Sequence, residues 1–419
     1  MRAFAEILIL ELKSLVRSKT AAILLVASVA WMAVFPHLVT GDGTADGLRE
    51  LTIRFSLGGV FALVTLSLLA SATGSLARER AARRLQLTMV RPVRFFALAL
   101  GKIAAHVLLG ALVLAVACAI LAATGDLARP CRHVLSPRLP TPREEAEEMY
   151  DYYMNSPMTP AVVKAARREV ILRLLENKAK DRYESVRTNE TKRWTFSGFS
   201  PCSAATVRLR FTNAYEVRQD VRGEFSICGL QGNVSNFTQA VIHVPLAPRA
   251  AGADGTTNEL VFVNHGTSAV MLRPRRDIHL LIAADDFAAN LRRAYLVLVA
   301  VLALIVSFGV FLSAGLGRPV ALFTAFVILA VSEMSPSVVS EYPDQLETDR
   351  LDRWGLVIAR AASEVTKPVS AASPLNALAN DECVEFSSVL RILLSDLLFA
   401  PLVLSLLAGF LLPRKQDEL

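Results

Sequence analysis

Long apolar runs constrain this chain more than any other feature of its sequence. Hydrophobic residues make up 53% of its 419 residues, which is more than an ordinary soluble domain holds. A transmembrane helix needs about 20 predominantly apolar residues. The sequence offers six such stretches, at residues 21–40, 54–76, 97–123, 294–316, 318–335 and 387–412. It therefore predicts an α-helical polytopic membrane protein with six transmembrane helices.

The fifth stretch is the weakest of the six. Its uninterrupted apolar part runs only from Pro319 to Val331, and Gly315-Leu316-Gly317-Arg318 alone separates it from the fourth stretch. We expect a helical hairpin with a tight turn, because proline suits the first turn of a helix.

The segment before the first stretch predicts an amphipathic helix lying along the membrane surface. Apolar residues recur there at helical spacing, and charged residues occupy the opposite face. The residues at helical spacing are Ile7, Leu8, Glu11, Leu12, Leu15 and Val16, and the charges that the whole segment carries are Glu6, Glu11, Lys13, Arg17 and Lys19.

Positive charge predicts the orientation of the helices. Short loops rich in lysine and arginine stay on the cytoplasmic side of a membrane. Between the second and third stretches, a single acid, Glu79, lies among six arginines: Arg78, Arg80, Arg83, Arg84, Arg91 and Arg94. With six spans, both ends of this chain join that loop in the cytoplasm. The localisation expected is a bacterial inner membrane.

Three regions follow from this topology. Residues 1–123 hold the surface helix and the first three spans, with a cytoplasmic loop at 77–96. Residues 124–291 form an external, periplasmic α+β domain, with a helical lead-in at 141–188 and a β-sandwich at 192–285. Residues 292–419 hold the last three spans, an acidic external loop at 336–386 and a short cytoplasmic tail.

Four of the five cysteines fall outside the membrane on this topology. Cys202 and Cys228 lie in the strand-rich part and predict a disulfide, since the compartment would be oxidising. The alternative is that both are small buried hydrophobic residues. Cys131 and Cys383 would lie close to the outer membrane surface, but equal depth is not contact, and this pair is not predicted.

Catalytic chemistry finds no support in the sequence. The chain contains no H-E-x-x-H, G-x-S-x-G or C-x-x-C motif, so we expect no enzyme activity, no cofactor, no metal and no nucleic-acid partner. His106 and Asp396 lie within predicted spans, where ionisable residues indicate a functional site or a helix-packing hydrogen bond. Both interpretations stay open.

The stretch at 75–105 resembles the first cytoplasmic loop of ABC transporter permeases of the ABC-2 type. The matching residues are Arg78-Glu79-Arg80, Leu85 to Val90, Arg91-Pro92-Val93 and Gly101-Lys102. Pro374 to Leu378 resembles their external loop more loosely. The external domain between spans three and four is a departure from typical short members.

This resemblance implies a permease that works with a separate cytoplasmic ATPase and with a second copy or a related half. The chain itself has no G-x-x-x-x-G-K-[ST] sequence. A short helix would offer Leu87 and Met89 to a groove on the ATPase, Arg83, Arg84 and Arg91 would pair with its carboxylates, and Pro92 would end the helix.

Two alternatives remain open. The arginines of the loop can serve only to hold it inside and to contact anionic lipid head groups. The whole chain can also be a membrane-anchored sensory or ligand-binding protein that uses its external sandwich. Six spans exceed what an anchor requires, which favours the permease.

Overall fold

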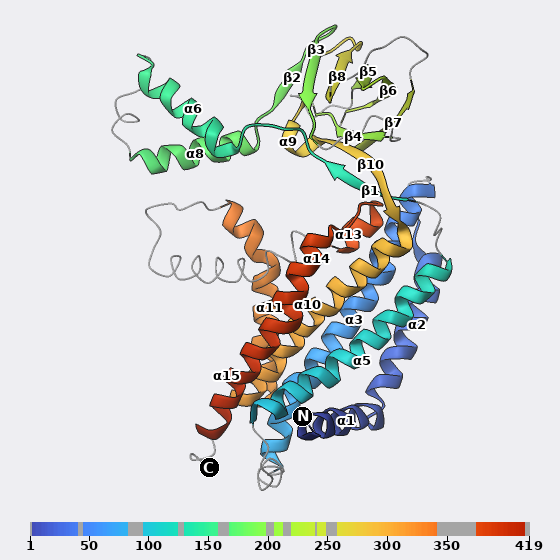
Figure 1. Cartoon of the computed structure of the whole chain (residues 1–419), viewed down its shortest axis with the longest axis vertical. Helices are drawn as coiled ribbons and strands as arrows, with labels where there is room; N and C mark the ends of the chain where they lie inside the picture. The colour runs from blue at the N-terminus through green and yellow to red at the C-terminus, as the bar shows by residue number, and fades with distance from the viewer. Residues whose placement is uncertain are drawn as a thin grey trace. The chain divides into compact units, whose positions relative to one another are not determined.

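The computed structural model describes residues 2–40, 45–82, 95–124, 130–157, 167–197, 205–212, 219–238, 241–248, 258–341 and 374–414. It divides into two compact units (Figure 1). One combines Met1–Cys131 with Asp285–Leu419 and is helical, and the other, Arg132–Ala284, is rich in strands.

The helical unit contains the membrane-spanning part of the chain. Its helices are α1 (Arg2–Arg17), α2 (Thr20–Leu38), α3 (Ala45–Ala81), α5 (Phe95–Thr124), α10 (Phe287–Gly315), α11 (Arg318–Glu341), α13 (Pro374–Ala379), α14 (Phe386–Ile392) and α15 (Ala400–Arg414). A π-helical segment, η1 (Leu393–Phe399), joins α14 to α15.

Five helices of the described chain are long and apolar enough to cross a membrane, which makes this a membrane-embedded, multi-pass protein. They are Thr20–Leu38, Gly47–Ala81, Phe95–Thr124, Phe287–Gly315 and the joined segment Phe386–Leu411. The fifth predicted span is not among them, because the apolar part of α11 that could be searched, Arg318–Val331, is shorter.

Helix α10 forms the centre of the bundle. It packs against α3, α5 and α15. In its most apolar 18-residue stretch 72% of the residues are buried, whereas the corresponding share for α2 is 17%. Glycines allow the close approach: a Cβ at Gly110 of α5 would lie 2.3 Å from Leu302 Cδ2, and one at Gly309 would lie 3.0 Å from Leu69 Cδ1. Small residues at contacts let helix backbones approach in membranes, where van der Waals packing drives association.

Both ends of the chain reach the same end of the bundle (Figure 1). Helix α1 packs against α5 where α5 begins, with Ile7 and Leu8 beside Gly101. Near the other end of the chain, Gly409 of α15 lies beside Phe95 and Phe96. An apolar face on α1, predicted from its sequence, contributes Leu15 to the buried core.

The strand-rich unit is built on one eight-stranded sheet with the order β1-β10-β4-β7-β6-β5-β8-β3. The strands are β1 (Pro130–Leu135), β3 (Thr191–Thr195), β4 (Ala205–Arg210), β5 (Asp220–Ile227), β6 (Leu230–Phe237), β7 (Val241–Pro248), β8 (Glu259–Asn264) and β10 (Ile278–Asp286). A second, two-stranded sheet pairs β2 (Glu184–Val186) with β9 (Val270–Leu272), and the short helix α9 (Pro274–Asp277) precedes β10.

Alternating side chains on these strands make the core of the sheet. Phe225 stacks on Phe262 at 4.5 Å between ring centroids, and Phe211 lies 5.3 Å from Phe262. The β5–β6 hairpin turns at Cys228 and Gly229, whose φ angles of 46° and 77° suit the two-residue turns that match strand twist.

The predicted β-sandwich is wrong in its form. The main strands belong to one continuous sheet that curls into a half-barrel, not to two separate sheets packed face to face. Strand β7 causes the difference, because it pairs with β4 along Val241–Leu246 and with β6 through Ala247 and Pro248. Alternation along each strand is the same in both architectures, so the sequence pattern does not distinguish them.

Ahead of the sheet, α6 (Pro142–Asn155) and α8 (Arg168–Lys180) form a helical pair. Ala146, Ile171 and Leu175 make its small core. Thr141 and Glu144 form a capping box at the start of α6, in which each side chain bonds to the backbone N–H of the other residue.

Candidate functional site

The cytoplasmic loop predicted as the coupling element lies only partly within the described residues. Arg78, Glu79 and Arg80 occupy the last turns of α3. The other six predicted loop residues, Arg83, Arg84, Leu87, Met89, Arg91 and Pro92, lie outside the described residues, so their docking role stays a prediction.

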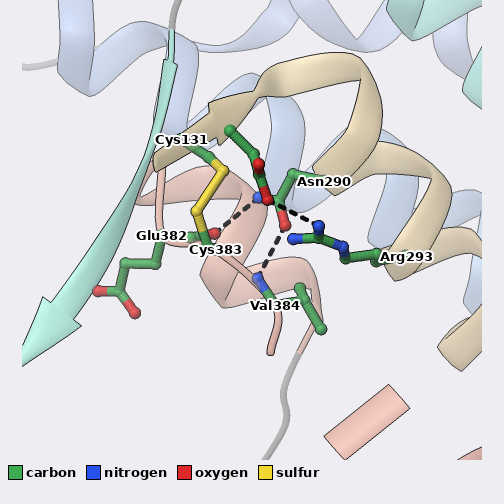
Figure 2. Close-up of a disulfide and its surroundings, with 7 residues drawn as sticks. Cys131, Asn290, Arg293, Glu382, Cys383 and Val384 are labelled. Atoms are coloured by element: carbon green, nitrogen blue, oxygen red, sulfur yellow. Dashed lines mark hydrogen bonds and ion pairs between the residues drawn. A yellow bond between two sulfur atoms is a disulfide. The ribbon is translucent and has the colours of Figure 1, made fainter. Parts of the chain in front are cut away.

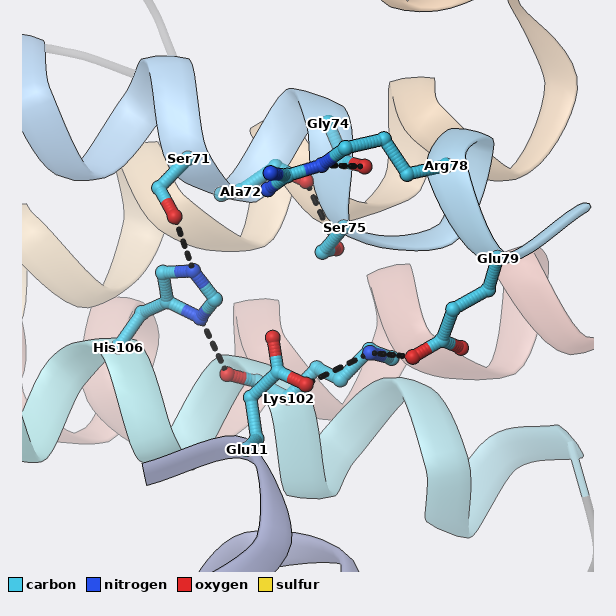
Figure 3. Close-up of polar contacts among 9 residues, drawn as sticks. All are labelled: Glu11, Ser71, Ala72, Gly74, Ser75, Arg78, Glu79, Lys102 and His106. Carbon is cyan, nitrogen blue, oxygen red and sulfur yellow. Dashed lines mark hydrogen bonds and ion pairs between the residues drawn. The ribbon is translucent and has the colours of Figure 1, made fainter. Parts of the chain in front are cut away.

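A buried lysine holds this end of the bundle together (Figure 3). Lys102 Nζ lies 2.8 Å from Glu11 Oε2 and 2.7 Å from Glu79 Oε1, and donates a hydrogen bond to each. The lysine side chain is 2% exposed, whereas Glu11 and Glu79 are 16% and 30% exposed. The cluster joins three elements: α1 through Glu11, α3 through Glu79 and α5 through Lys102. It therefore connects the surface helix to the point where the chain enters the loop.

Both arginines beside Glu79 donate to backbone carbonyl groups, and Arg80 does so at the end of another helix. Arg80 donates to the carbonyl oxygens of Ala314 and Leu316, at 2.6 and 2.9 Å. The last carbonyls of a helix have no partner inside it, and cations are favoured there. Arg80 thus fixes the end of α10 to α3. Arg78 Nε donates to the Gly74 carbonyl of its own helix at 2.9 Å.

His106 continues the network one turn further along α5. Its Nδ1 lies 2.8 Å from the Lys102 carbonyl oxygen and its Nε2 lies 3.1 Å from Ser71 Oγ of α3 (Figure 3). The ring is fully buried. This geometry matches the helix-packing interpretation of His106.

Asp396, the other ionisable residue singled out within a span, belongs to η1. It is 4% exposed, and Ser395 Oγ donates to its Oδ1 at 2.7 Å. Its Oδ2 is buried and has no hydrogen-bond partner in the described part of the chain. No hydrogen bond joins Asp396 to His106 within the described residues.

Four consecutive residues anchor the opposite end of the bundle. Asp381 pairs with Arg49 of α3 at 2.6 Å, and the Glu382 carbonyl oxygen accepts from Asn290 Nδ2 of α10 at 2.7 Å. The backbone N–H of residue 384, a valine, donates to Asn290 Oδ1 at 2.8 Å (Figure 2). Cys383, between them, bonds to Cys131. The segment 381–384, here called the anchor segment, thereby ties the start of α14 to α3, α10 and Cys131.

The disulfide in the anchor segment is a pair that the sequence did not predict. Cys131 and Cys383 are 252 residues apart in sequence and are bonded, with their Cα atoms 5.3 Å apart (Figure 2). Cys202 lies outside the described residues, so the predicted bond between Cys202 and Cys228 stays a prediction.

The central residues of the polar cluster were missed as a site. In the sequence, Gly101-Lys102 counts only as part of the loop resemblance, and Glu11 only as one of the residues at helical spacing in the first helix. The sequence did contain one indication of this site. Lys102 is the sixth residue of the apolar stretch 97–123, and a charge at such a position needs a counter-charge. The sequence did not say which carboxylate supplies it.

Neither a family model, a curated protein nor a solved structure matches this chain. Within the described residues, no group of three or more His, Cys, Asp or Glu side chains is placed to hold a metal ion. A function is therefore inferred from the chain's own geometry and from the resemblance of residues 75–105 to ABC-2 permeases.

Proposed function

We propose that this chain is the membrane-spanning permease subunit of an ATP-binding cassette transporter of the ABC-2 type. A separate cytoplasmic ATPase binds the loop around residues 78–94, and a second copy or related half completes the pathway.

The observation that carries this proposal is the cluster around Lys102. A loop that transmits force from an ATPase needs a rigid connection to the helices that move. Lys102 supplies one, because it binds Glu79 in the last turns of α3, just before the loop, and Glu11 of the surface helix. Arg80 extends the connection to α10, the central helix of the bundle. An arginine-rich loop that only set topology would require none of these contacts.

We also propose a sixth crossing of the membrane, by α11. Arg80 binds the Leu316 carbonyl at one end of α3, and Arg49 binds Asp381 near the other end. These two arginines are about 46 Å apart along the helix, at 1.5 Å per residue. The chain must therefore traverse the bundle between Leu316 and Asp381. Two described helices lie in that interval, α11 with 24 residues and α13 with 6, and only α11 has the length for a crossing.

Six crossings support an orientation with both ends of the chain in the cytoplasm. The ends of α1 and α15 lie beside the loop-bearing end of the bundle, where arginines are concentrated. The disulfide lies at the opposite end, in agreement with an oxidising compartment such as the periplasm. We place the protein in an inner membrane on these grounds.

Co-purification tests the proposed function. The tagged, full-length chain is extracted from its native membranes, and the proteins that accompany it are identified by mass spectrometry. We expect a soluble protein with a Walker A motif. Lys102→Met should reduce its recovery, whereas Lys13→Met, at an exposed position of α1, should not.

Two results would count against the permease. One is wild-type chain that carries no ATPase even after mild cross-linking of intact membranes. The other is full ATPase recovery by a folded Lys102→Met variant, which would remove the cluster from the coupling role. The first result would favour a sensory protein that uses its strand-rich unit.

A further inference from the structure

Asp396 lies near the middle of the membrane-spanning bundle. Val384, which bonds to Asn290, marks one end of the last helix, and Leu411, beside Gly315, marks the other. Asp396 is about 18 Å from the first and about 22 Å from the second, at 1.5 Å per residue. The hydrocarbon core of a bilayer is about 30 Å thick, so the carboxyl group lies deep inside it.

The side chain of Asp396 faces the interior of the bundle, not lipid. Its neighbours on the outer surface, Leu394, Leu398 and Phe399, are 53%, 55% and 68% exposed, whereas Asp396 is 4% exposed. The segment η1 packs against α10, the most buried helix. The carboxyl group is therefore shielded by protein on the inner side of the last span.

The bonding of this carboxyl group is incomplete. Ser395 Oγ donates a hydrogen bond to Oδ1 of Asp396. The other carboxylate oxygen, Oδ2, is buried without a hydrogen-bond partner in the described part of the chain. An ionised carboxylate without a partner is very costly in an apolar medium. A small cation on the free oxygen removes that cost.

No cationic side chain of the neighbouring elements supplies the missing charge. Among the described elements, those packed most closely against η1 are α10, α14 and α15. Between Leu296 and Gly315, α10 carries no titratable residue. Arg391 of α14 is exposed, whereas Asp396 is buried. The remaining titratable residues of these elements lie near their ends: Arg292, Arg293 and Tyr295 at the start of α10 and Arg414 at the end of α15.

We propose that Asp396 binds a monovalent cation, either a proton or Na⁺, at the middle of the membrane. The local helix form agrees with this role, because π-helical turns are rare and occur frequently at functional sites. The proposal does not rest on the ATPase partner, and it gives the last span a part in transport that the coupling loop does not provide.

Carbodiimide labelling of the intact protein tests the proposal. N,N′-Dicyclohexylcarbodiimide is apolar and adds to protonated carboxyl groups inside membranes. In native membrane vesicles free of Na⁺, we expect an adduct on Asp396, located by peptide mass mapping, that increases as the pH falls. If Na⁺ is the cation, added NaCl should suppress the adduct and KCl should not. If the site takes only protons, neither salt should change it.

Matched variants isolate the residue. Asp396→Asn should lose the adduct, and Ser395→Ala, which keeps the carboxyl group, should retain it. Asp381, which is paired with Arg49 at the end of the bundle, should remain unlabelled by the apolar reagent. The proposal is overturned if wild-type Asp396 stays unlabelled from acid to neutral pH. It is also overturned if a water-soluble carbodiimide labels Asp396 as readily, because the site would then be open to water.

Discussion

Lys102 is held almost completely away from water by two carboxylates that water still reaches. Removing one partner of a buried ion pair typically destabilises a protein by 3–5 kcal/mol, because the other charge is left without compensation. We expect the loss of stability on removing Lys102 to lie near the lower end of this range. The side chains of Glu11 and Glu79 are still 16% and 30% exposed, so water partly screens their charges.

We predict that Lys102→Met lowers the stability of the helical unit by about 3 kcal/mol, by removing the charge between two carboxylates. Glu11→Gln should cost more than Glu79→Gln, because Glu11 is the less exposed partner. Thermal unfolding in detergent, followed with a dye that reacts with buried Cys118, measures the ranking. Equal melting temperatures for Lys102→Met and the control Lys13→Met would contradict the buried cluster.

The Cys131–Cys383 bond closes a loop of 252 residues. On the loop-entropy model such a bond contributes roughly 5 kcal/mol, an upper limit because membrane spans already restrict the unfolded chain. We predict a cross-linked peptide containing both cysteines in unreduced digests of native membranes. Cys131→Ser with Cys383→Ser should unfold at a lower temperature. Two free thiols at these positions would refute the bond.

These residues show what the sequence supports and where it stops. The depth of Cys131 and Cys383 follows from the predicted topology, but their contact depends on how the segment before α14 packs beside the residue that follows the third span. Lys102 was recognisable as a charge within an apolar stretch. Its partners come from helices far apart in sequence, and only packing brings them together.

At the scale of elements, we expect the stability of the first turn of α6 to depend on pH. The hydrogen bond from the Thr141 backbone N–H lowers the pKa of the Glu144 carboxyl group. A carboxylate with a lowered pKa adds stability above its ordinary pKa of 4.5, and this stability is lost as the pH falls through the folded value.

We therefore predict that the first turn of α6 exchanges its amide protons faster at acid pH, after correction for intrinsic rates. Thr141→Ala should raise exchange about fivefold at neutral pH, since a lost N-cap costs about 1 kcal/mol. Glu144→Gln should remove the pH dependence, and Glu148→Gln, an exposed control on the same helix, should retain it. An unchanged pH profile in Glu144→Gln would show that the capping box is absent.

Helices and strands were predictable where apolar residues recur at a clear spacing. The way the strands pair into a sheet was not predictable from that spacing. Helix α1 and five membrane-length helices follow from spacing and length. The half-barrel does not, because strand alternation is equally compatible with a sandwich, and only the pairing of β7 with both β4 and β6 selects the single sheet.

At the scale of the whole molecule, topology can be read with single cysteines. In a chain that keeps Cys131 and Cys383 but lacks the other three cysteines, thiols at Ser136 and Glu385 should react with an impermeant reagent in spheroplasts. Thiols at Ala82 and Gly317 should not. Gly317 accepts a side chain, since nothing lies within 4 Å of an added Cβ. Labelling of Gly317 and Glu385 from the same side would mean that α11 does not cross the membrane.

The central claim is that the loop near residue 87 docks on an ATPase and does more than hold the chain in place. Leu87→Asp with Met89→Asp puts charges into an apolar contact, where an unpaired buried charge costs several kcal/mol. Arg83→Gln with Arg84→Gln removes charges that act mainly on encounter and register, so its effect should depend on salt.

Recovery of the ATPase by each variant, with membrane insertion verified separately, is the most direct measurement. We predict that the Leu87/Met89 variant inserts normally and recovers no ATPase. The Arg83/Arg84 variant should recover less ATPase than the wild type at low salt, and the difference should shrink as salt screens the wild-type charges. Normal ATPase recovery by an inserted Leu87/Met89 variant would contradict the account, because the loop would then serve topology alone.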